Sequence, residues 1–143
     1  MLRNSLQLAV LSLCIGTFAD RASAESGINL IVEGVRNEHG NILVLVFDNA
    51  AGFETLNYET AVDIAEIKAQ SGSVRYTFGQ LNEGPYAIFL FHDENGDDDL
   101  NTKGGRLLEG VGATGAPNRN DEPDFTGASV MPGNVTVRLH YDQ

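Results

Sequence analysis

The sequence predicts an all-β protein, an immunoglobulin-like or prealbumin-like β-sandwich of about seven strands with one long loop rich in Gly, Asp and Asn. Three features lead to this prediction. Two segments alternate apolar with polar side chains, two others are apolar at nearly every position, and turn-forming residues separate them. Strand patterns without long helices are typical of two sheets packed face to face.

The first two predicted strands are residues 27–35 and 42–47. The first is rich in apolar and β-branched residues, and the second is apolar on both faces, which is typical of a central, buried strand. Residues 37–41 between them are polar and include Gly40, which can adopt a positive φ. We therefore expect the two strands to form a hairpin.

The middle of the chain holds one ambiguous segment and two further strands. Residues 48–58 form a connection in which Phe53 is expected to reach the core, and residues 61–67 fit a short helix or a strand equally well. Residues 74–78 alternate apolar with polar side chains, which predicts a strand with one face in water. Residues 86–91 are apolar on both faces and predict a second central strand.

The end of the chain combines a long loop with a closing strand. Residues 135–141 alternate apolar with polar side chains and place His140 on the water-facing side. The stretch between residues 91 and 125 has little strand character, and loops this long in a compact domain are usually functional or disordered. We expect an ordered loop, held to the sandwich by its apolar residues Leu107, Leu108, Val111 and Phe125.

The N-terminus has the pattern of a secretory signal peptide. Arg3 supplies a positive charge, and residues 6–18 are apolar but too few to span a membrane stably. An Ala-Ser-Ala cleavage sequence follows at residues 22–24. We therefore predict a signal peptide over residues 1–24 and a single periplasmic or extracellular domain over residues 25–143, without a transmembrane segment.

The only cysteine is Cys14. It would carry the anchor of a lipoprotein, but Leu13 stands where such sites usually need a small residue, which favours a cleaved signal peptide. Cleavage after Ala24 removes Cys14, so the domain would have no disulfide, no thiol chemistry and no cysteine zinc site.

The formal net charge of the chain is −11. The predicted signal peptide carries Arg3 and Arg21 against Asp20, so its removal leaves −12. Such an acidic domain repels nucleic acid and anionic lipid surfaces. Such a domain is suited to cations or basic partners. The alternative is that most of the charge only keeps the protein soluble, except where it is dense, at residues 93–99.

The clearest functional signal is an acidic segment directly after the second central strand. Oxygen-bearing side chains occupy every second position there: Asp93, Asn95, Asp97, Asp99 and Asn101. Calcium prefers such carboxylate, amide and carbonyl oxygens, and the spacing matches the alternating ligands of the helix-loop-helix calcium loop. The sequence therefore predicts a calcium site at these residues.

The segment departs from that motif at two positions. Asp98 stands at the sharp turn, where the motif has Gly, and Gly104 stands where the motif has its bidentate Glu. Further carboxylates from the same long loop could replace the missing ligand: Glu109, Asp121 and Asp124. The alternative is a solvated acidic turn whose Asp and Asn side chains bond their own backbone.

Other motifs do not predict a reaction. Residues 110–115 match the GxGxxG dinucleotide pattern, but no helix follows, so these glycines are expected to let the loop turn tightly. His39, His92 and His140 are scattered. His92 could be a ligand or a hydrogen-bonded strand end, and the second is expected. No serine has the setting of a nucleophile. We predict no catalytic residue and no nucleotide cofactor.

The order of short motifs resembles a family of secreted bacterial proteins defined by a domain of unknown function. The motifs are EGPYA at residues 83–87, HDENGD at 92–97, LNT at 100–102, EGVG at 109–112 and PDF at 123–125. The resemblance spans nearly the whole predicted domain and implies a periplasmic or extracellular β-sandwich, without a function.

This chain departs from the family pattern twice. Asp98 stands where the usual residue is Gly, and Asn101 stands where it is Asp, which leaves the metal prediction open. The sequence therefore favours a non-enzymatic exported module that is calcium-stabilised and binds an unknown protein or saccharide at its loop end. The alternatives are a metal-dependent enzyme using the acidic loop, and a structural or accessory envelope protein without a small ligand.

Overall fold

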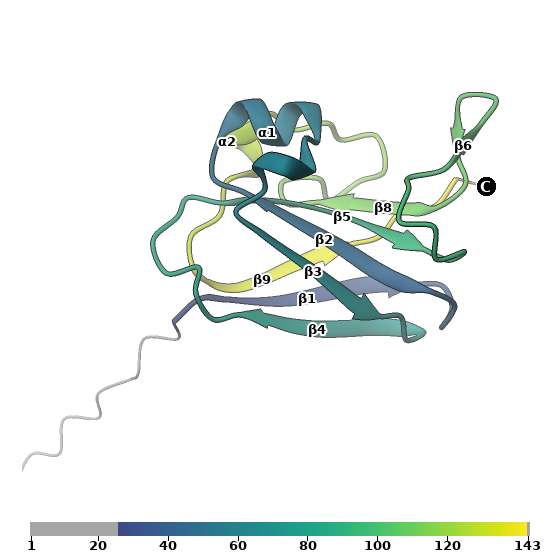
Figure 1. Cartoon of the computed structure of the whole chain (residues 1–143), viewed down its shortest axis with the longest axis horizontal. Helices are drawn as coiled ribbons and strands as arrows, with labels where there is room; N and C mark the ends of the chain where they lie inside the picture. Colours follow the sequence, from purple (N-terminus) through teal and green to yellow (C-terminus); the bar gives the residue numbers. More distant parts are fainter. Residues whose placement is uncertain (1–25, 143) are drawn as a thin grey trace, which may run out of the picture.

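Two β-sheets packed face to face form the body of the protein (Figure 1). The computed structural model describes residues 26–142. Its elements in chain order are β1 (Ile28–Val35), β2 (Asn41–Phe47), α1 (Ala50–Thr55), the 3-10 helix η1 (Tyr58–Thr60), β3 (Asp63–Lys68), β4 (Gly72–Phe78), β5 (Ala87–Asp93), β6 (Thr102–Lys103), β7 (Arg106–Leu107), β8 (Gly110–Ala113), α2 (Phe125–Ala128) and β9 (Gly133–Arg138). The sheets have the orders β4-β1-β9 and β3-β2-β5-β8, while β6 pairs with β7. The predicted all-β sandwich is confirmed.

The predicted hairpin of residues 27–35 and 42–47 is wrong. β1 pairs with β4 and β9, whereas β2 pairs with β3 and β5, so the turn between them crosses from one sheet to the other. The crossing lets the inner faces of β1 and β2 bury each other, because Leu30 and Val44 both lie in the core between the sheets. A hairpin would have placed both strands in the same sheet.

The main core lies between the two sheets. The largest of its fully buried apolar side chains come from β1, β2, β5 and β9: Ile28, Leu30, Val32, Ile42, Val44, Val46, Ile88, Leu90 and Val137. Burying one such side chain stabilises the fold by about 1.5–3 kcal/mol. β2 and β5, which contain most of the two all-apolar segments, both lie in the middle of the four-stranded sheet, as predicted, and they are neighbours there.

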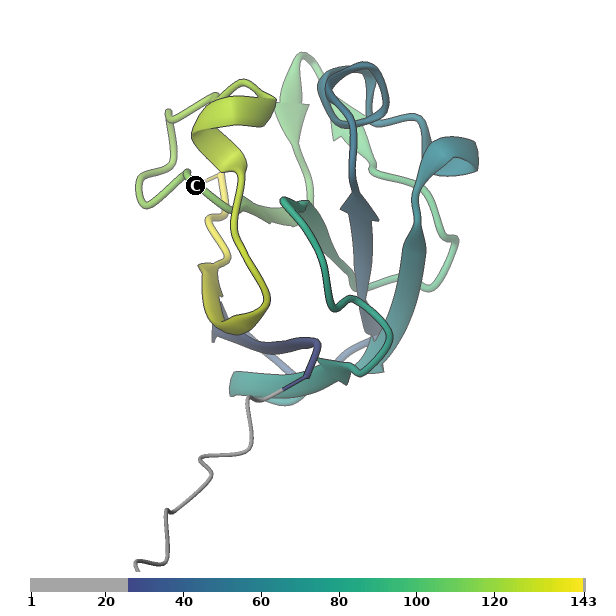
Figure 2. The ribbon, with the colours of Figure 1, turned by 90° about the vertical axis from the view of Figure 1, so that its left-hand side faces the viewer.

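A second apolar cluster lies on the outer face of the four-stranded sheet. Phe53 of α1 packs edge-on against Phe47, with 6.1 Å between ring centroids, and against Phe125 of α2, with 6.4 Å. Asn49 caps α1 by accepting a hydrogen bond from the N–H of Gly52 at 2.8 Å. Figures 1 and 2 show α1 and α2 side by side over one end of this sheet. The prediction that Phe53 reaches the core is confirmed.

The ambiguous segment at residues 61–67 is mostly strand, since β3 pairs antiparallel with β2. The long stretch after β5 also contains a strand that the sequence did not predict. Within it β8 pairs antiparallel with β5 and completes the four-stranded sheet. Two of its four residues, Gly110 and Gly112, have no side chain to show an apolar pattern.

Gly110 and Gly112 are not turn formers, which corrects the expectation for these two positions of the GxGxxG segment, whereas Gly115 does lie in a turn. A Cβ on Gly110 would lie 2.3 Å from the ring of Tyr141, and one on Gly112 would lie 2.5 Å from the carbonyl oxygen of Arg138. Both positions therefore have to be glycine so that the C-terminal segment can pack against β8. Only Gly115 of the motif has a positive φ, 75°.

The prediction of one closing strand through residue 141 is wrong in its last part. β9 ends at Arg138, and His140 then exchanges two backbone hydrogen bonds with Val111 of β8, at 2.8 and 2.9 Å. The chain thus leaves β1 and closes the side of the sandwich between the two sheets. As a result the Nε2 atom of His140 is buried rather than in water.

The predicted signal peptide at residues 1–24, with Cys14, lies outside the described residues. Within residues 26–142, no helix has the length and apolar character needed to cross a membrane.

Candidate metal site

Asp93, the last residue of β5, organises the acidic loop. Its side chain is fully buried, and its carboxylate accepts three backbone hydrogen bonds. Oδ1 accepts from the N–H groups of Gly96 and Asp97 at 2.7 and 3.3 Å, and Oδ2 accepts from that of Asp98 at 3.0 Å. These donors compensate the burial of a charge and wrap the loop around one carboxylate. One of the roughly four lone-pair positions of the carboxylate stays free.

Asp98 adopts the backbone conformation that the calcium-loop comparison assigns to Gly. Its φ is +62°, in the left-handed region that Asp and Asn visit more readily than other residues with a side chain. The sharp turn is therefore made without a glycine, so the first departure from the motif does not prevent the loop from turning.

The turn between β1 and β2 supports the end of β5. Gly40 has a φ of +61°, and a Cβ there would lie 1.8 Å from the carbonyl oxygen of Asp93. No side chain fits in this space. Gly40 therefore lets the turn pack directly against the backbone of Asp93.

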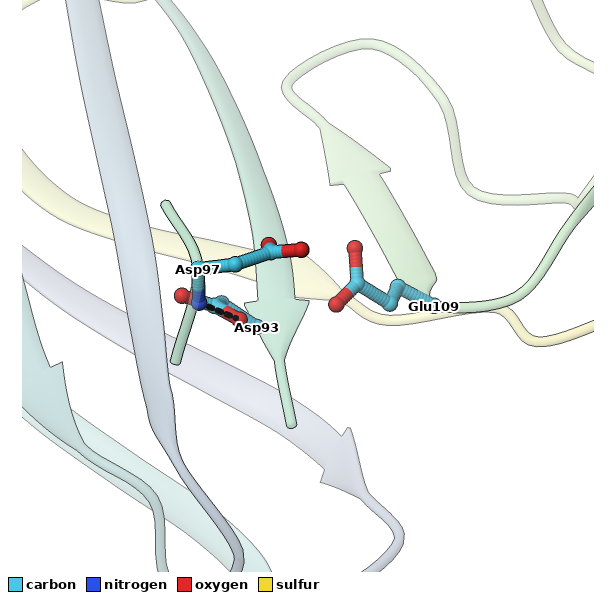
Figure 3. A group of neighbouring side chains, drawn as sticks. All are labelled: Asp93, Asp97 and Glu109. Carbon is cyan, nitrogen blue, oxygen red and sulfur yellow. Dashed lines mark hydrogen bonds between the residues drawn. The ribbon is translucent and has the colours of Figure 1, made fainter. Parts of the chain in front are cut away.

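Three carboxylates converge at this end of the sheet (Figure 3). Asp93, Asp97 and Glu109 each offer an oxygen, and these oxygens lie within 4.8 Å of one another. Asp93 and Glu109 are buried, while Asp97 is exposed and opens the cluster to solvent. This chain has Gly104 where the helix-loop-helix motif has its bidentate Glu. Glu109, just before β8, places a carboxylate beside the acidic loop in its stead.

Glu109 is 4% exposed and only half satisfied by hydrogen bonds. Its Oε2 accepts from the N–H of Asn101 at 3.0 Å, whereas its buried Oε1 receives no hydrogen bond of ordinary geometry from the described residues. Burial raises the pKa of Glu109; the N–H groups of Asn101 and Glu94 act against this, and the negative charges of Asp93 and Asp97 add to it. The site therefore holds a buried carboxylate oxygen for which the described residues provide no hydrogen bond of ordinary geometry.

The side chain of Asp97 accepts hydrogen bonds from both asparagines of the loop. Its Oδ2 accepts from the side-chain amides of Asn95 at 2.9 Å and Asn101 at 3.1 Å, and its Oδ1 accepts from the N–H of Asp99 at 3.1 Å. The N–H of Asp99 and these two amides lower the pKa of Asp97. Asn95 and Asn101 therefore lie beside the carboxylate cluster, as a shared site requires.

The remaining candidate ligands lie elsewhere. The side chain of Asp99 is exposed and lines a groove on the outer face of the sheet. Asp121 accepts a hydrogen bond from the N–H of Asn118 at 2.7 Å, and Asp124 caps α2 by accepting from Gly127 at 2.7 Å. Among the described residues, neither Asp121 nor Asp124 joins the cluster.

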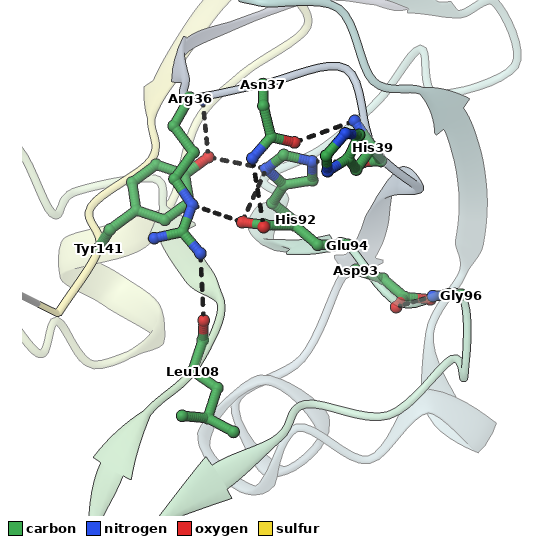
Figure 4. A network of polar contacts seen from close by, with 9 residues as sticks. All are labelled: Arg36, Asn37, His39, His92, Asp93, Glu94, Gly96, Leu108 and Tyr141. Atoms are coloured by element: carbon green, nitrogen blue, oxygen red, sulfur yellow. Dashed lines mark hydrogen bonds and ion pairs between the residues drawn. The ribbon is translucent and has the colours of Figure 1, made fainter.

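A polar network behind the site involves residues that the sequence analysis missed (Figure 4). His92 is fully buried. Its Nε2 lies 2.7 Å from the carbonyl oxygen of His39 and must donate, so in the neutral ring Nδ1 accepts from the Tyr141 hydroxyl at 2.9 Å. The Tyr141 oxygen in turn accepts from the N–H of Arg36 at 3.2 Å. The expectation that His92 is a hydrogen-bonded strand end is confirmed.

Arg36 connects the two backbone segments that carry the buried carboxylates. Its Nε donates to Glu94, next to Asp93, at 2.6 Å, and its Nη2 donates to the carbonyl oxygen of Leu108, next to Glu109, at 3.4 Å. Its guanidinium also lies 4.5 Å from the centre of the Tyr141 ring. Arg36 therefore fixes the spacing between the two sides of the cluster.

Glu94 is held as an anion by this network. Burial acts to raise its pKa, but the hydrogen bonds from Arg36 and from the Asn37 amide, with the positive charge of Arg36, outweigh burial and lower it. No local pattern in the sequence points to Arg36 or Tyr141. Arg36 lies 58 positions before its partner Glu94, and Tyr141 lies 105 positions after Arg36.

Comparison with known proteins identifies the family. The model of DUF2141, described as an uncharacterized protein conserved in bacteria, matches residues 30–138. The chain belongs to this family. The DUF2141 match covers the main strands of the sandwich except the first two residues of β1, and it includes the acidic loop and Glu109. No curated protein and no solved structure matches this DUF2141 chain.

Proposed function

We propose that this DUF2141 chain is an exported, non-enzymatic β-sandwich module of the bacterial envelope whose acidic loop binds one calcium ion. Export is supported by the N-terminal pattern of charge, apolar stretch and cleavage sequence at residues 1–24. Extracellular calcium-binding modules have dissociation constants of about 10⁻⁴–10⁻³ M, so an open site with three carboxylates needs no tighter binding than this.

The observation that carries the proposal is the convergence of Asp93, Asp97 and Glu109 within 4.8 Å, with one buried Glu109 oxygen that receives no hydrogen bond of ordinary geometry from the described residues. Like charges this close repel each other, and hydrogen bonds compensate Asp93 and Asp97, which accept three each, better than Glu109, which accepts one. A divalent cation would neutralise the repulsion and supply the missing partner of Glu109.

The residues present fit the oxygen coordination of calcium. Asp93, Asp97 and Glu109 supply three carboxylates. Asn95 and Asn101 would add amide oxygens after rotation of their side chains, and the Asp99 carbonyl corresponds to the backbone ligand of the helix-loop-helix motif. Calcium takes about six to eight oxygens in flexible geometry, whereas magnesium demands a near-ideal octahedron. A loop of this kind favours calcium.

The ion would act on structure rather than on a substrate. Bound between the end of β5 and the segment before β8, it would join two parts of the long loop that otherwise repel each other. His92, the histidine nearest the cluster in sequence, has both ring nitrogens engaged and is not a free general base. The engaged His92 ring supports a structural role for the ion, which would keep the loop ordered at this end of the sandwich.

Calorimetric titration of residues 25–143 with calcium tests the proposal. The wild-type domain is expected to bind one ion, with magnesium at least about ten-fold weaker. Asp97→Asn preserves size and hydrogen-bond acceptance but removes a ligand charge, so calcium affinity should fall by about ten-fold or more. Glu83→Gln, an exposed carboxylate in a distant turn, is the matched control and should bind as the wild type does. Equal affinities for wild type and Asp97→Asn, or no binding at all, would reject the site.

A further inference from the structure

The outer face of the four-stranded sheet carries two rows of apolar side chains. In one row Ile64 of β3 is paired with Leu45 of β2, which is paired with Phe89 of β5. In the next row Leu43 of β2 is paired with Phe91 of β5, and the row ends at the exposed Glu66 of β3. Paired residues on one face of a sheet pack side by side, so these rows form a continuous apolar floor.

Part of this floor is left open. The helices α1 and α2 cover the end of the sheet that holds Phe47 and Ala87 (Figure 1). Beyond them a groove of about 440 Å³ lies over the two apolar rows. Leu56 and Tyr58 line it beside α1, and Ile64 lines it on β3, with 37%, 65% and 50% of their surfaces exposed.

The opposite wall of the groove is the acidic loop. Asp98, Asp99 and Leu100 line it there, and both carboxylates are exposed. Within residues 26–142 no hydrogen bond or ion pair reaches the side-chain carboxylate of Asp98 or of Asp99, and no Lys, Arg or His lines the groove. The groove therefore combines an apolar floor with an anionic rim.

We propose that this groove binds a small amphiphilic amine, that is, an aliphatic or aromatic body with one cationic group. The volume of about 440 Å³ suits a small organic molecule, for which pockets of roughly 300–1,000 Å³ are usual. The body would lie on Phe89, Phe91 and Leu45, and the ammonium group would pair with Asp98 and Asp99. The inference deepens the proposed function and rests on it in one respect, because the loop that calcium orders supplies the charged wall.

A series of ligands with the same tail separates the apolar from the charged contribution. Residues 25–143 are titrated, in saturating calcium, with n-octylamine, n-octanol and octanoate, followed by amide chemical shifts in NMR spectra. Octylamine should bind saturably, with shifts at Ile64, Phe89 and Leu100. Octanol should bind about five-fold more weakly, as expected for the loss of a partly exposed ion pair, and octanoate more weakly still.

Three variants locate the site. The double variant Asp98→Asn, Asp99→Asn should lose the preference for octylamine over octanol while keeping its octanol affinity. Ile64→Lys places a charge on the groove floor and should abolish binding of all three ligands. Tyr76→Lys alters a residue of comparable exposure, 40% against 50% for Ile64, on β4 in the other sheet, and should bind as the wild type does.

Equal affinity for octylamine and octanol in the wild type would refute the charged rim, and a Tyr76→Lys effect as large as that of Ile64→Lys would refute the groove. Calcium affinity is measured by calorimetry on the same samples. Calcium binding without saturable binding of any ligand overturns the groove and leaves the calcium site standing. Saturable octylamine binding without calcium binding overturns the proposed function and leaves the groove standing.

Discussion

Replacing Glu109 by Gln should stabilise the calcium-free domain and destabilise the calcium-loaded domain relative to the wild type. The substitution keeps the size of the side chain, and its amide oxygen can still accept the N–H of Asn101. It removes the buried charge that faces Asp93 at no more than 4.8 Å. The sign of the effect should therefore depend on the metal.

The magnitude follows from the separation of the charges. Two unit charges 4.8 Å apart repel by about 3.5 kcal/mol at an effective dielectric constant of about 20 and by about 0.9 kcal/mol at about 80. Because Asp97 opens the cluster to solvent, we take the lower part of this range and expect Glu109→Gln to raise the calcium-free stability by about 1 kcal/mol. For a domain of this size that raises the melting temperature by roughly 3–6 °C.

Calcium should reverse the order of stability. At a free concentration about 100 times its Kd, an ion that binds only the folded state stabilises it by about 2.7 kcal/mol. The wild type should gain this stability. Glu109→Gln lacks one ligand charge, so with an affinity about ten-fold lower it should gain only about 1.4 kcal/mol, and less where the loss of affinity is larger. Thermal unfolding followed by circular dichroism, in chelator and in calcium, measures both differences, with Glu83→Gln as the control for a general change in net charge.

Two results would refute this reasoning. If Glu109→Gln is less stable than the wild type in chelator and in calcium by the same amount, Glu109 contributes only hydrogen bonding and packing. If it is more stable under both conditions, the repulsion is real but calcium does not relieve it.

Further substitutions test the supports of the loop. Gly40→Ala should lower stability by about 2 kcal/mol or more and weaken calcium binding in titrations, because its Cβ would collide with the Asp93 carbonyl at 1.8 Å. Asp98→Gly should bind calcium as the wild type does, whereas Asp98→Val should lose about 1–2 kcal/mol in denaturant unfolding, because a β-branched residue is strained at a φ of +62°. Arg36→Met should flatten the acid limb of the stability curve. Because folding lowers the pKa of Glu94, this group stabilises the fold at pH values above its ordinary pKa of 4.5, and the contribution is lost as the pH falls through the folded-state pKa. Urea unfolding between neutral and acidic pH should therefore show a steeper loss of stability in the wild type than in the variant.

Each of these substitutions has a control on the same scaffold. Gly79→Ala meets open space and should leave stability and calcium binding unchanged. Arg75→Met removes an exposed cation from β4 and should keep the wild-type acid limb. A Gly40→Ala domain as stable as the wild type would contradict the close packing at Asp93. An Arg36→Met curve parallel to that of the wild type would show that Arg36 does not hold the Glu94 charge.

Much of the strand content was predictable from the sequence because side-chain periodicity is local. A strand exposes its pattern within a few residues, so residues 42–47 and 74–78 were recognised from their own side chains. The acidic loop was recognisable for the same reason, since Asp93 and Asp97 follow one another closely along the chain. The residue types that form the site were therefore available without any knowledge of the fold.

Strand pairing was not predictable in this way. A short polar turn fits both a hairpin and a crossing between sheets, and the choice depends on which arrangement buries both faces of β2. The strand β8 was also missed, because Gly110 and Gly112 are required by the close approach of Tyr141 and Arg138 and not by any local pattern.

The sequence by itself determined that the chain is a β-sandwich with an acidic loop after a buried strand, because periodicity, turn residues and charge density are properties of neighbouring residues. Only the tertiary structure decided that Glu109 completes the carboxylate cluster while Asp121 and Asp124 do not, and that Arg36 fixes both sides of it. It also decided that the acidic loop forms one wall of an apolar groove. These contacts join residues far apart in the chain, and the packing of the whole core sets the distances between them.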